Sequence, residues 1–401
     1  MMNNSKKLQD STKKINVMFL FHDSELNNGA VRSMIDVIEG LVFKYNINPI
    51  IVYPDNKGTA INYLESKGIS CYNIRYGHWA YCDQEKFIKK LYLVIRIIGK
   101  FGYALKNLSR FKEIIIKENI DICYSNTSVI YIGALLHSRF NIPHIWHIRE
   151  FGAEDHNLKF IPSRKFLYKI MSNSSDAIIY ISKSVQKKYH SFIKSDIIQK
   201  VIYNDISKDF INPKKRFNYN KKLLLSVIGD IKEGKGQLEV VQAVYKLYLK
   251  NFDIELHIAG KQDGSYYQRI SQYVKDHNME SYVVFDGFIR DVNSYRNKMD
   301  VGIVSSSSEA FGRVTIEGML SMMAMIGANT AGTKELIIDR ENGLLYESHN
   351  IDDLASKIEL LYQDRELLYL LASNGFKYAK DNFTIASASD SIYKLITEIL
   401  T

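Results

Sequence analysis

The sequence predicts an α/β protein made of two Rossmann-like domains, each a parallel sheet covered by helices. Short runs rich in valine, isoleucine and tyrosine alternate with longer segments whose apolar residues recur every 3.6 positions, which is the pattern of strands joined by crossover helices. This alternation lapses over Asp205–Lys222 and then starts again. The length of 401 residues also suits two domains of the usual size.

The first series of strands precedes the lapse, and helices are expected between its members. Each run is short and contains β-branched or aromatic residues, as a buried strand requires. The expected strands are Asn16–Phe21, Pro49–Tyr53, Ser70–Ile74, Asp121–Tyr124, His144–His147, Ala177–Ile181 and Lys200–Ile202.

Asp205–Lys222 is expected to be an exposed linker, because it is polar and basic and contains Pro213. The second series of strands follows it. A final amphipathic helix over Phe383–Leu400 has no strand after it, and its apolar side fits a face of either domain. The strands expected in this half are Leu223–Ile228, Ile254–Ala259, Val283–Phe285, Val301–Val304 and Ala324–Ala328.

The composition is that of a folded protein that is neither secreted nor integral to a membrane. Hydrophobic residues make up 46% of the chain and charged residues 24%, with 27 tyrosines and 19 phenylalanines, which argues against disorder. Three cysteines (Cys71, Cys82 and Cys123) cannot form a disulfide framework. No signal peptide and no apolar run of about 18 residues is found. We expect a cytoplasmic protein that can also contact the inner face of the cell membrane.

The positive charge is concentrated in the first half of the chain. Overall, 53 basic residues face 44 acidic ones, for a formal net charge of +9. The first 210 residues hold 30 basic and 19 acidic residues, a net +11, whereas the remainder holds 23 and 25, a net −2. A basic domain of this kind suits an anionic partner such as a membrane, a nucleic acid or a charged substrate.

Residues 85–118 contain nine basic and three acidic residues, with apolar residues at helical spacing between them. This is how a helix lying on an anionic membrane is built, with its apolar side in the bilayer and its cations toward the headgroups. An ordinary solvated helix face is the alternative. A membrane is favoured over nucleic acid as the partner. The candidate membrane or acceptor face comprises Lys86, Lys89, Lys90, Arg96 and Lys100, among Phe87, Leu91, Val94, Ile95 and Ile98.

The segment Glu309-Ala-Phe-Gly-Arg-Val-Thr-Ile-Glu317 follows an expected strand and four serines, and it opens a helix. A helix N-terminus favours anions because its first N–H groups are unpaired. Eight residues of continuous helix would separate the two glutamates by about 12 Å, too far for one acid–base pair unless the chain bends sharply. They could instead hold two ends of a long ligand, with a diphosphate beside the Gly312–Thr315 amides. Two capping acids are the alternative.

Two further loops are candidate phosphate sites. Val227–Gln237 is a turn in which Gly229, Gly234 and Gly236 permit a tight backbone course and Lys235 supplies a point charge, although the P-loop pattern is absent. In the first domain, Asn27-Asn28-Gly29-Ala30 starts a helix with Val31, Met34, Ile35 and Ile38 facing inward. A plain turn with an N-cap is the alternative at this position.

His147 lies at the carboxyl end of an expected strand, where α/β sheets bind ligands. It could bond a sugar hydroxyl or position an acceptor, and a structural histidine is the alternative. His22 is similarly placed. No cluster has metal-ligand spacing and no Gly-x-Ser-x-Gly element occurs, so neither a metal nor a covalent serine mechanism is expected.

In combination, these motifs resemble those of the retaining GT-B glycosyltransferases of family 4, also called group 1. The resemblance rests on Glu309-Ala-Phe-Gly-x4-Glu317, the preceding Gly229-x5-Lys235-Gly236 element, and the following Gly332-x-x-Glu335-Leu and Asn342-Gly343-Leu-Leu. It extends over nearly the whole chain, with Trp146-His-x-x-Glu150 and Ser175-Asp-Ala-Ile-Ile in the first half.

The resemblance implies a GT-B fold whose domains span 1–205 and 206–381, with residues 382–401 returning as a helix to the first domain. It also implies metal-independent transfer of a hexose or N-acetylhexosamine, from a UDP-sugar rather than a GDP-sugar, to a growing, lipid-linked cell-surface glycan. The anomeric configuration would be retained through front-face attack. No cofactor is expected beyond the donor substrate itself.

Residue roles follow from motif position in that family. Glu317 would bind ribose hydroxyls and Glu309 the transferred sugar, while His147 would lie near the reacting sugar. Lys235, together with Gly229 and Gly236, would meet the diphosphate, which Gly29 would approach from the other domain. The resemblance further implies that Phe311, Gly312, Arg313, Val314 and Thr315 bind the sugar and phosphates, and that Phe288 and Ile289 flank the base.

The chain departs from the family pattern at several positions. Asp230 follows Gly229 where an arginine is common, so a diphosphate cation is missing, for which Arg313 or Lys232 could substitute. Asp205 stands where glycine is usual, and Gly318 replaces a common alanine. Two other activities therefore stay open: a non-catalytic partner that assists another transferase, and a hexosamine-nucleotide epimerase of the same fold.

Overall fold

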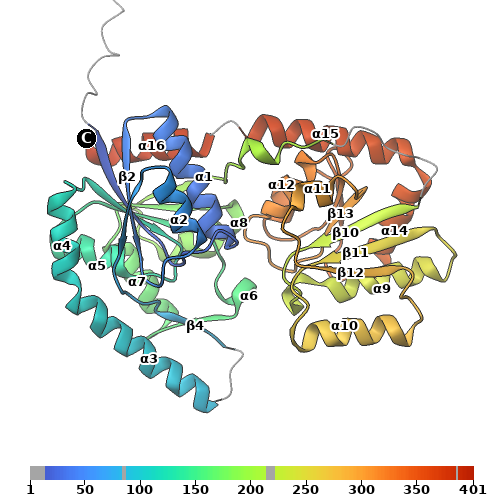
Figure 1. Cartoon of the computed structure of the whole chain (residues 1–401), viewed down its shortest axis with the longest axis horizontal. Coiled ribbons are helices and arrows are strands. Elements are labelled where there is room, and N and C mark those ends of the chain that lie inside the picture. Colours follow the sequence, from blue (N-terminus) through green and yellow to red (C-terminus); the bar gives the residue numbers. More distant parts are fainter. Residues whose placement is uncertain (1–13, 84–86, 214–221, 385–386) are drawn as a thin grey trace, which may run out of the picture. The chain divides into compact units, whose positions relative to one another are not determined.

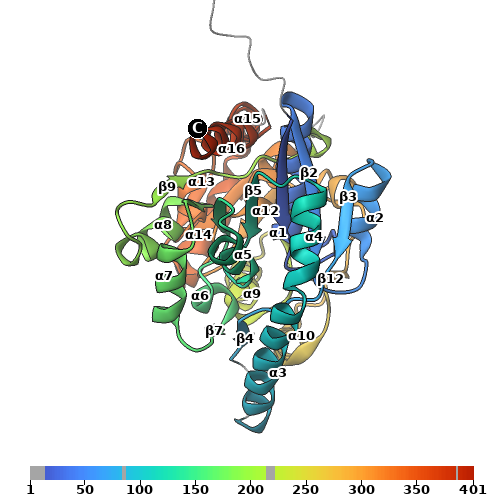
Figure 2. The same ribbon diagram turned by 90° about the vertical axis from the view of Figure 1, so that its left-hand side faces the viewer.

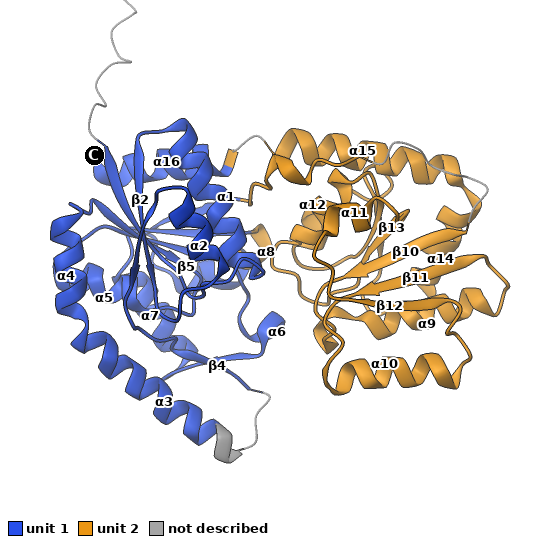
Figure 3. Cartoon of the chain, in the orientation of Figure 1, with its two compact units in different colours: residues 1–181, 186–202, 388–401 blue, residues 182–185, 203–387 orange. Residues whose placement is uncertain are grey.

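The computed structural model describes residues 14–83, 87–213, 222–384 and 387–401. The chain divides into two compact units (Figure 3). The first unit comprises residues 1–181, 186–202 and 388–401, and the second comprises residues 182–185 and 203–387. Each unit is a parallel sheet covered by helices, which confirms the predicted α/β class with two Rossmann-like domains.

The first unit contains a seven-stranded parallel sheet in the order β3-β2-β1-β5-β6-β8-β9. All seven strands were expected, and their ends differ from the expected ones by no more than two residues. A short antiparallel pair, β4 (Ala80–Cys82) with β7 (Leu158–Phe160), was not predicted. The strands of the sheet are β1 (Ile15–Leu20), β2 (Ile47–Tyr53), β3 (Ser70–Asn73), β5 (Ile122–Asn126), β6 (His144–Ile148), β8 (Ala177–Tyr180) and β9 (Ile198–Val201).

Helices cover this sheet, and α3 extends well past its edge (Figures 1 and 2). In α1, the apolar residues expected to face inward are buried. No helix in the described ranges is both long and apolar enough to cross a bilayer. The helices, of which α8 and α16 begin in residues assigned to the second unit, are α1 (Gly29–Lys44), α2 (Thr59–Ser66), α3 (Phe87–Lys106), α4 (Leu108–Lys117), α5 (Ile132–Phe140), α6 (Ala153–His156), α7 (Arg164–Asn173), α8 (Lys183–Tyr189) and α16 (Ser387–Leu400).

Helix α16 completes the core of the first unit, beside α1 (Figure 1). Ile392, Leu395 and Ile396 are fully buried in the same cluster as the apolar side of α1. At its rim, the rings of Tyr45 and Tyr393 stack with centroids 3.8 Å apart. Burial of each large aliphatic side chain contributes about 1.5–3 kcal/mol, so α16 is a substantial part of this core.

Two expectations for the connecting segments need correction. The predicted helix over Phe383–Leu400 starts instead at Ser387, because Phe383 is the last residue of the preceding helix α15 (Arg365–Phe383). The predicted exposed linker over Asp205–Lys222 starts with buried residues: Asp205 is 5% exposed and accepts a hydrogen bond from Ser387 Oγ at 3.3 Å. Residues 214–221 of that linker lie outside the described ranges.

The second unit contains a six-stranded parallel sheet in the order β12-β11-β10-β13-β14-β15. Four of its strands have the expected ends, β12 is two residues longer, and β15 was not predicted. These strands are β10 (Leu223–Ile228), β11 (Ile254–Ala259), β12 (Val283–Gly287), β13 (Val301–Val304), β14 (Ala324–Ala328) and β15 (Leu344–Tyr346).

Helices lie on both faces of the second sheet, with α9, α10 and α14 on one face and α11, α12 and α15 on the other (Figure 1). Strand β10 pairs with both β11 and β13, so the chain reverses its direction of travel across the sheet at β10. The remaining helices are α9 (Gln237–Tyr248), α10 (Gly264–Asp276), α11 (Val292–Arg296), α12 (Arg313–Leu320), α13 (Thr333–Leu336) and α14 (Ile351–Gln363).

Candidate active site

The candidate site of the second unit lies where the loops after β10 and β13 meet. Open α/β sheets bind ligands outside the carboxyl ends of the strands at such a reversal point. Ser305 Oγ donates to the carbonyl of Lys235 at 2.7 Å, and the amide of Ser307 donates to the carbonyl of Gly234 at 3.2 Å. These bonds join the two glycine- and serine-rich loops into one surface.

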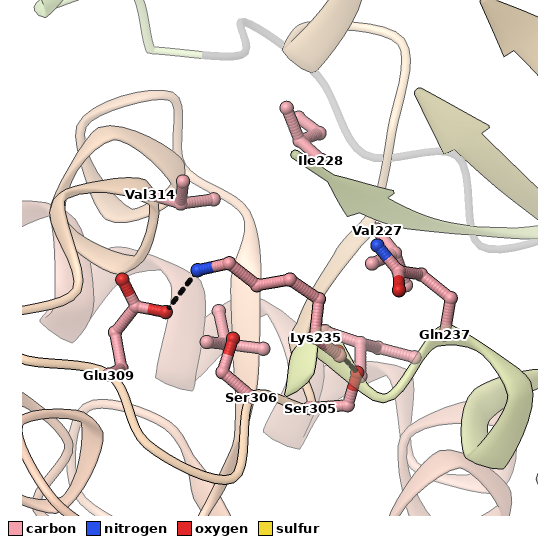
Figure 4. Close-up of a pocket in the computed structure, with 10 residues that line it drawn as sticks. Val227, Ile228, Lys235, Gln237, Ser305, Ser306, Glu309 and Val314 are labelled. Atoms are coloured by element: carbon pink, nitrogen blue, oxygen red, sulfur yellow. Dashed lines mark hydrogen bonds and ion pairs between the residues drawn. The ribbon is translucent and has the colours of Figure 1, made fainter. Parts of the chain in front are cut away.

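Lys235 and Glu309 form an ion pair in a pocket at this junction (Figure 4). The two side chains approach from opposite walls, with Lys235 Nζ 2.7 Å from Glu309 Oε2. Val314 and Ser306 line the same pocket. The structure therefore brings together the two second-unit residues expected to carry the chemistry.

A left-handed residue at Gly236 positions Lys235. Gly236 has φ +68°, and a Cβ there would lie 2.4 Å from the carbonyl oxygen of Ser305. Any other residue would push the two loops apart. Asp230, which stands where an arginine is common, forms an exposed pair with Lys232 at 2.7 Å.

Helix α12 begins directly beside this pocket. Gly312 is its N-cap with φ +99°, and Glu309 lies in the loop before it, so the two motif glutamates are not on one continuous helix. The estimate of about 12 Å for a straight helix therefore does not apply. Gly332 makes this loop possible, because its amide donates to the carbonyl of Glu309 at 2.7 Å and its lack of a side chain leaves room for the loop. Thr315 is buried in the first turn of α12.

Glu317 is held by two arginines. Arg296, on α11, donates from Nη2 to Glu317 Oε2, and Arg313 Nε lies 2.7 Å from Glu317 Oε1. The Arg296 side chain is 2% exposed and the Glu317 side chain 9%. The Arg313 guanidinium also lies over the Phe210 ring, 5.3 Å from its centroid. The Arg313 guanidinium is thus held beside Glu317 by these contacts.

The residues expected to flank the base follow β12. Phe288 is 67% exposed, whereas Ile289 is half-buried. Phe311 differs from both: its side chain is buried, and its ring lies 6.0 Å from that of Tyr203. An exposed aromatic ring can stack on a flat ligand. Phe288 has such a ring, whereas the ring of Phe311 is buried.

In the first unit, the loop at Gly29 has a complete N-cap. Asn28 Oδ1 accepts from the amides of Ala30 at 3.0 Å and Val31 at 3.3 Å. Asn28 Nδ2 in turn donates to Asp23 at 3.0 Å. Two of the first amides of α1 are therefore already bonded, as the N-cap alternative predicted, while a Cβ at Gly29 would meet nothing within 4 Å.

His147 is 1% exposed on β6. Its Nδ1 lies 2.7 Å from the Tyr124 hydroxyl, whereas its buried Nε2 has no hydrogen-bond partner among the described residues. Burial, followed by the nearby Arg149 charge, lowers the pKa of His147 well below the usual value. The ring is therefore neutral at pH 7, suited to hydrogen bonding and unsuited to supplying positive charge.

The predicted basic face is on α3. Lys86 lies outside the described residues, as does the side chain of Lys89. Lys90 pairs with Asp83 at 2.6 Å, and Arg96 is exposed. Lys100 is half-buried and packs against Gly77, so it lies on the packed side of the helix.

The same helix exposes a row of large apolar side chains. Their helical spacing places these side chains along one side of α3, and each is 44% to 61% exposed. They belong to Leu91, Ile95, Ile98, Phe101 and Leu105. We call these five residues the α3 stripe.

Two buried arginines near the candidate sites were missed by sequence reasoning. Arg149 follows β6, donates from Nε to Asn126 Oδ1 and lies near His147, a position that the strand-end rule could have indicated. Arg296 gave no signal, because α11 is a single helical turn and Glu317 lies 21 positions later. In the described ranges, no group of three or more His, Cys, Asp or Glu side chains could hold a metal ion.

Residues 207–378 match the family of glycosyl transferases group 1. An uncharacterized glycosyltransferase of Methanocaldococcus jannaschii is 30% identical over 283 residues, covering 70% of this chain and 76% of the relative. The N-acetyl-α-D-glucosaminyl L-malate synthase of Bacillus anthracis is 26% identical over 278 residues, covering 66% and 71%.

A Campylobacter jejuni enzyme named as an α-N-acetylgalactosaminyltransferase acting on a diphospho-undecaprenol-linked sugar is 25% identical over 236 residues, covering 58% and 63%. Among solved structures, Anabaena HepE in complex with UDP and glucose superposes with a TM-score of 0.74 at 18% identity, covering 96% of this chain and 99% of that one. This likeness confirms the predicted GT-B fold.

Proposed function

The chain belongs to the group 1 glycosyltransferases, and from that premise we propose that it moves a hexose or an N-acetylhexosamine from a UDP-sugar to a growing cell-surface glycan, with retention of configuration. The observation that carries this proposal is the Lys235–Glu309 pair, which lies in a pocket beside the N-terminus of α12. A cation and a helix N-terminus favour a diphosphate, and a carboxylate accepts bonds from sugar hydroxyls.

The proposed reaction breaks the bond between the anomeric carbon and the diphosphate oxygen. The acceptor oxygen forms its bond to that carbon on the same face, and its proton passes to an oxygen of the departing diphosphate. Lys235 and the first amides of α12 stabilise the negative charge on the leaving group, the largest contribution expected in such a site. Glu309 orients the sugar, while Glu317 holds the ribose. We propose that no metal ion is required, since these groups supply the positive charge.

The names of similar proteins support the donor class. HepE was solved with UDP and glucose, one relative is named as an N-acetyl-α-D-glucosaminyl L-malate synthase, and another is named as an α-N-acetylgalactosaminyltransferase. An α-linked product from an α-linked donor is what retention gives. The Campylobacter jejuni relative is named for a lipid-linked acceptor, which supports the same class of acceptor here.

We further propose that the α3 stripe rests on an anionic membrane, where a lipid-linked acceptor is anchored. Five large apolar side chains on one side of a helix are 44% to 61% exposed, and of these Phe101 also contacts the ring of Tyr131, with centroids 5.3 Å apart. Tyr92 and Tyr103 flank the stripe, and both are more than half exposed, as is suitable for the bilayer interface. Exposed Arg96 adds attraction to anionic headgroups, and so does the net +11 of the first 210 residues.

Transfer is tested by measuring UDP release from UDP-sugars with candidate acceptors. Lys235→Ala should reduce turnover about 100-fold or more. Lys246→Ala is the matched control, because Lys246 pairs with Asp352 and its side chain is 44% exposed, compared with 40% for Lys235. Equal turnover of the two variants would contradict the role of Lys235. Conversion of the donor without any acceptor would instead indicate an epimerase, and donor binding without turnover a non-catalytic partner.

Membrane contact is tested by co-sedimentation with vesicles containing about one-third phosphatidylglycerol. Ile95→Glu, in the middle of the α3 stripe, should weaken binding about tenfold or more, because it places a charge in the apolar region. Leu370→Glu is the control, since Leu370 is 52% exposed on α15, in the second unit. The proposal fails if both variants bind as well as the unaltered protein, or if the unaltered protein does not bind at low salt.

A further inference from the structure

Arg296 is buried in the second unit and directly contacts one of the proposed donor-binding residues. Its side chain is 2% exposed, and its Nη2 donates to Glu317 Oε2. It lies at the end of α11, next to Tyr295, whose hydroxyl donates to Asp286 at 2.8 Å in β12. The helical turn that carries Arg296 is therefore fixed to the strand that leads to Phe288.

The burial of Arg296 is costly for the fold. Its Nε and Nη1 are both buried and have no hydrogen-bond partner among the described residues. Burial lowers the pKa of the guanidinium, even though Glu317 raises it. A buried ion pair is commonly no more stable than well-packed apolar residues of similar volume. Stability alone therefore does not explain an arginine at this position.

The arrangement instead fixes the orientation of the Glu317 carboxylate. Arg296 contacts one oxygen and Arg313 the other, so neither oxygen can turn away without breaking a charged hydrogen bond. A carboxylate has about four acceptor positions. Two arginine donors therefore leave capacity for two more, which is the number of donors that the vicinal hydroxyls of a ribose present.

We propose that Arg296 is a positioning residue for nucleotide recognition: it holds Glu317 in the orientation that accepts the ribose hydroxyls. This inference rests on the proposed function, in which Glu317 binds the ribose. Because Arg296 is 2% exposed, it acts through Glu317 and does not touch the nucleotide. Its effect should therefore depend on the ribose hydroxyls themselves.

The test compares binding of UDP and 2′-deoxy-UDP by titration calorimetry, using the full chain. The unaltered protein should prefer UDP by about 10- to 100-fold, the range of a hydrogen bond to a charged group. In Arg296→Met, this ratio should fall to within about threefold, and Arg296→Lys should restore part of it. Arg365→Met serves as a control, because Arg365 stacks on Tyr362 in the same unit and should leave the ratio unchanged.

The outcomes separate this inference from the proposed function. If Glu317→Gln abolishes the preference but Arg296→Met lowers the affinity for both nucleotides by the same factor, Arg296 has a structural role alone and the inference is wrong. If Glu317→Gln keeps the preference, the ribose-binding role of Glu317 is wrong and the inference falls with it. If Arg296→Met does not fold, the ratio measured in Arg296→Lys decides: an unaltered ratio overturns the inference.

Discussion

The two motif glutamates should contribute very differently to the stability of the second unit. Glu317→Ala leaves Arg296 buried without its carboxylate, in a place where that guanidinium already has two nitrogen atoms without a described partner. Glu309→Ala leaves Lys235 without its carboxylate, but the Lys235 side chain is 40% exposed and can be solvated by water. The same substitution therefore removes a buried ion pair in one case and a half-exposed one in the other.

The difference is large enough to measure. Removal of one partner of a buried ion pair costs about 3–5 kcal/mol, whereas a solvent-exposed pair contributes about 0–1 kcal/mol. For a unit of this size, each kcal/mol lowers the melting temperature by roughly 2–4 °C. Glu317→Ala should therefore lower the melting temperature of the second unit by roughly 6–20 °C, and Glu309→Ala by roughly 4 °C or less.

Differential scanning calorimetry of the full chain can resolve this, supplemented by urea titration. The double variant Arg296→Met/Glu317→Leu is the internal control, because it removes both charges of the Arg296–Glu317 pair and should recover part of the stability lost in Glu317→Ala, with Arg313 left as the remaining charge. Equal destabilisation by Glu317→Ala and Glu309→Ala would refute the reasoning. So would a Glu317→Ala loss below about 1 kcal/mol.

Other consequences can be tested with simpler measurements. Burial lowers the pKa of His22 to about 3, that of His144 to about 4 and that of His147 well below the usual value. Below about pH 6.5 the unfolded chain therefore binds more protons than the folded chain, so the free energy of unfolding is highest above that pH and falls as the pH drops toward the folded-state pKa values. The urea midpoint should be lower at pH 5 than at pH 7, and each histidine should contribute up to about 2 kcal/mol to the difference. A pH-independent midpoint in this range would contradict this. Gly318→Ala should destabilise by about 1 kcal/mol despite its better helix propensity, because the new Cβ would lie 2.5 Å from Met325 Sδ; the loss should shrink with Met325→Val, and an additive cycle would disprove the contact. Turnover should be unaffected by EDTA, and a loss restored by Mg²⁺ or Mn²⁺ would contradict metal independence.

The sequence was most informative where local pattern and tertiary structure agree. β10 and β13 have the predicted ends because each is a mostly apolar run bounded by polar or glycine residues. β15 was missed because three residues give no periodic signal. β4 and β7 pair although the chain between them is more than 70 residues long, a pairing that no local window can detect.

The candidate site was predicted to a similar extent. Lys235 and Glu309 could be named from their motifs, and the structure places them 2.7 Å apart. Arg296 could not be named, because its role follows from a tertiary contact with Glu317 and from burial. Asp205 was misassigned to an exposed linker for the same reason, since its burial depends on a contact with Ser387.

The core of the first unit has a consequence for the order in which the chain can fold during synthesis. Its cluster includes Ile392, Leu395 and Ile396, which follow the whole of the second unit in the sequence. Those three side chains contribute about 5–9 kcal/mol of burial energy, comparable with the entire net stability of a typical domain. The first unit therefore leaves the ribosome before the second unit but reaches its final stability after it. Until then, the exposed side of its sheet and α1 must be kept from aggregating.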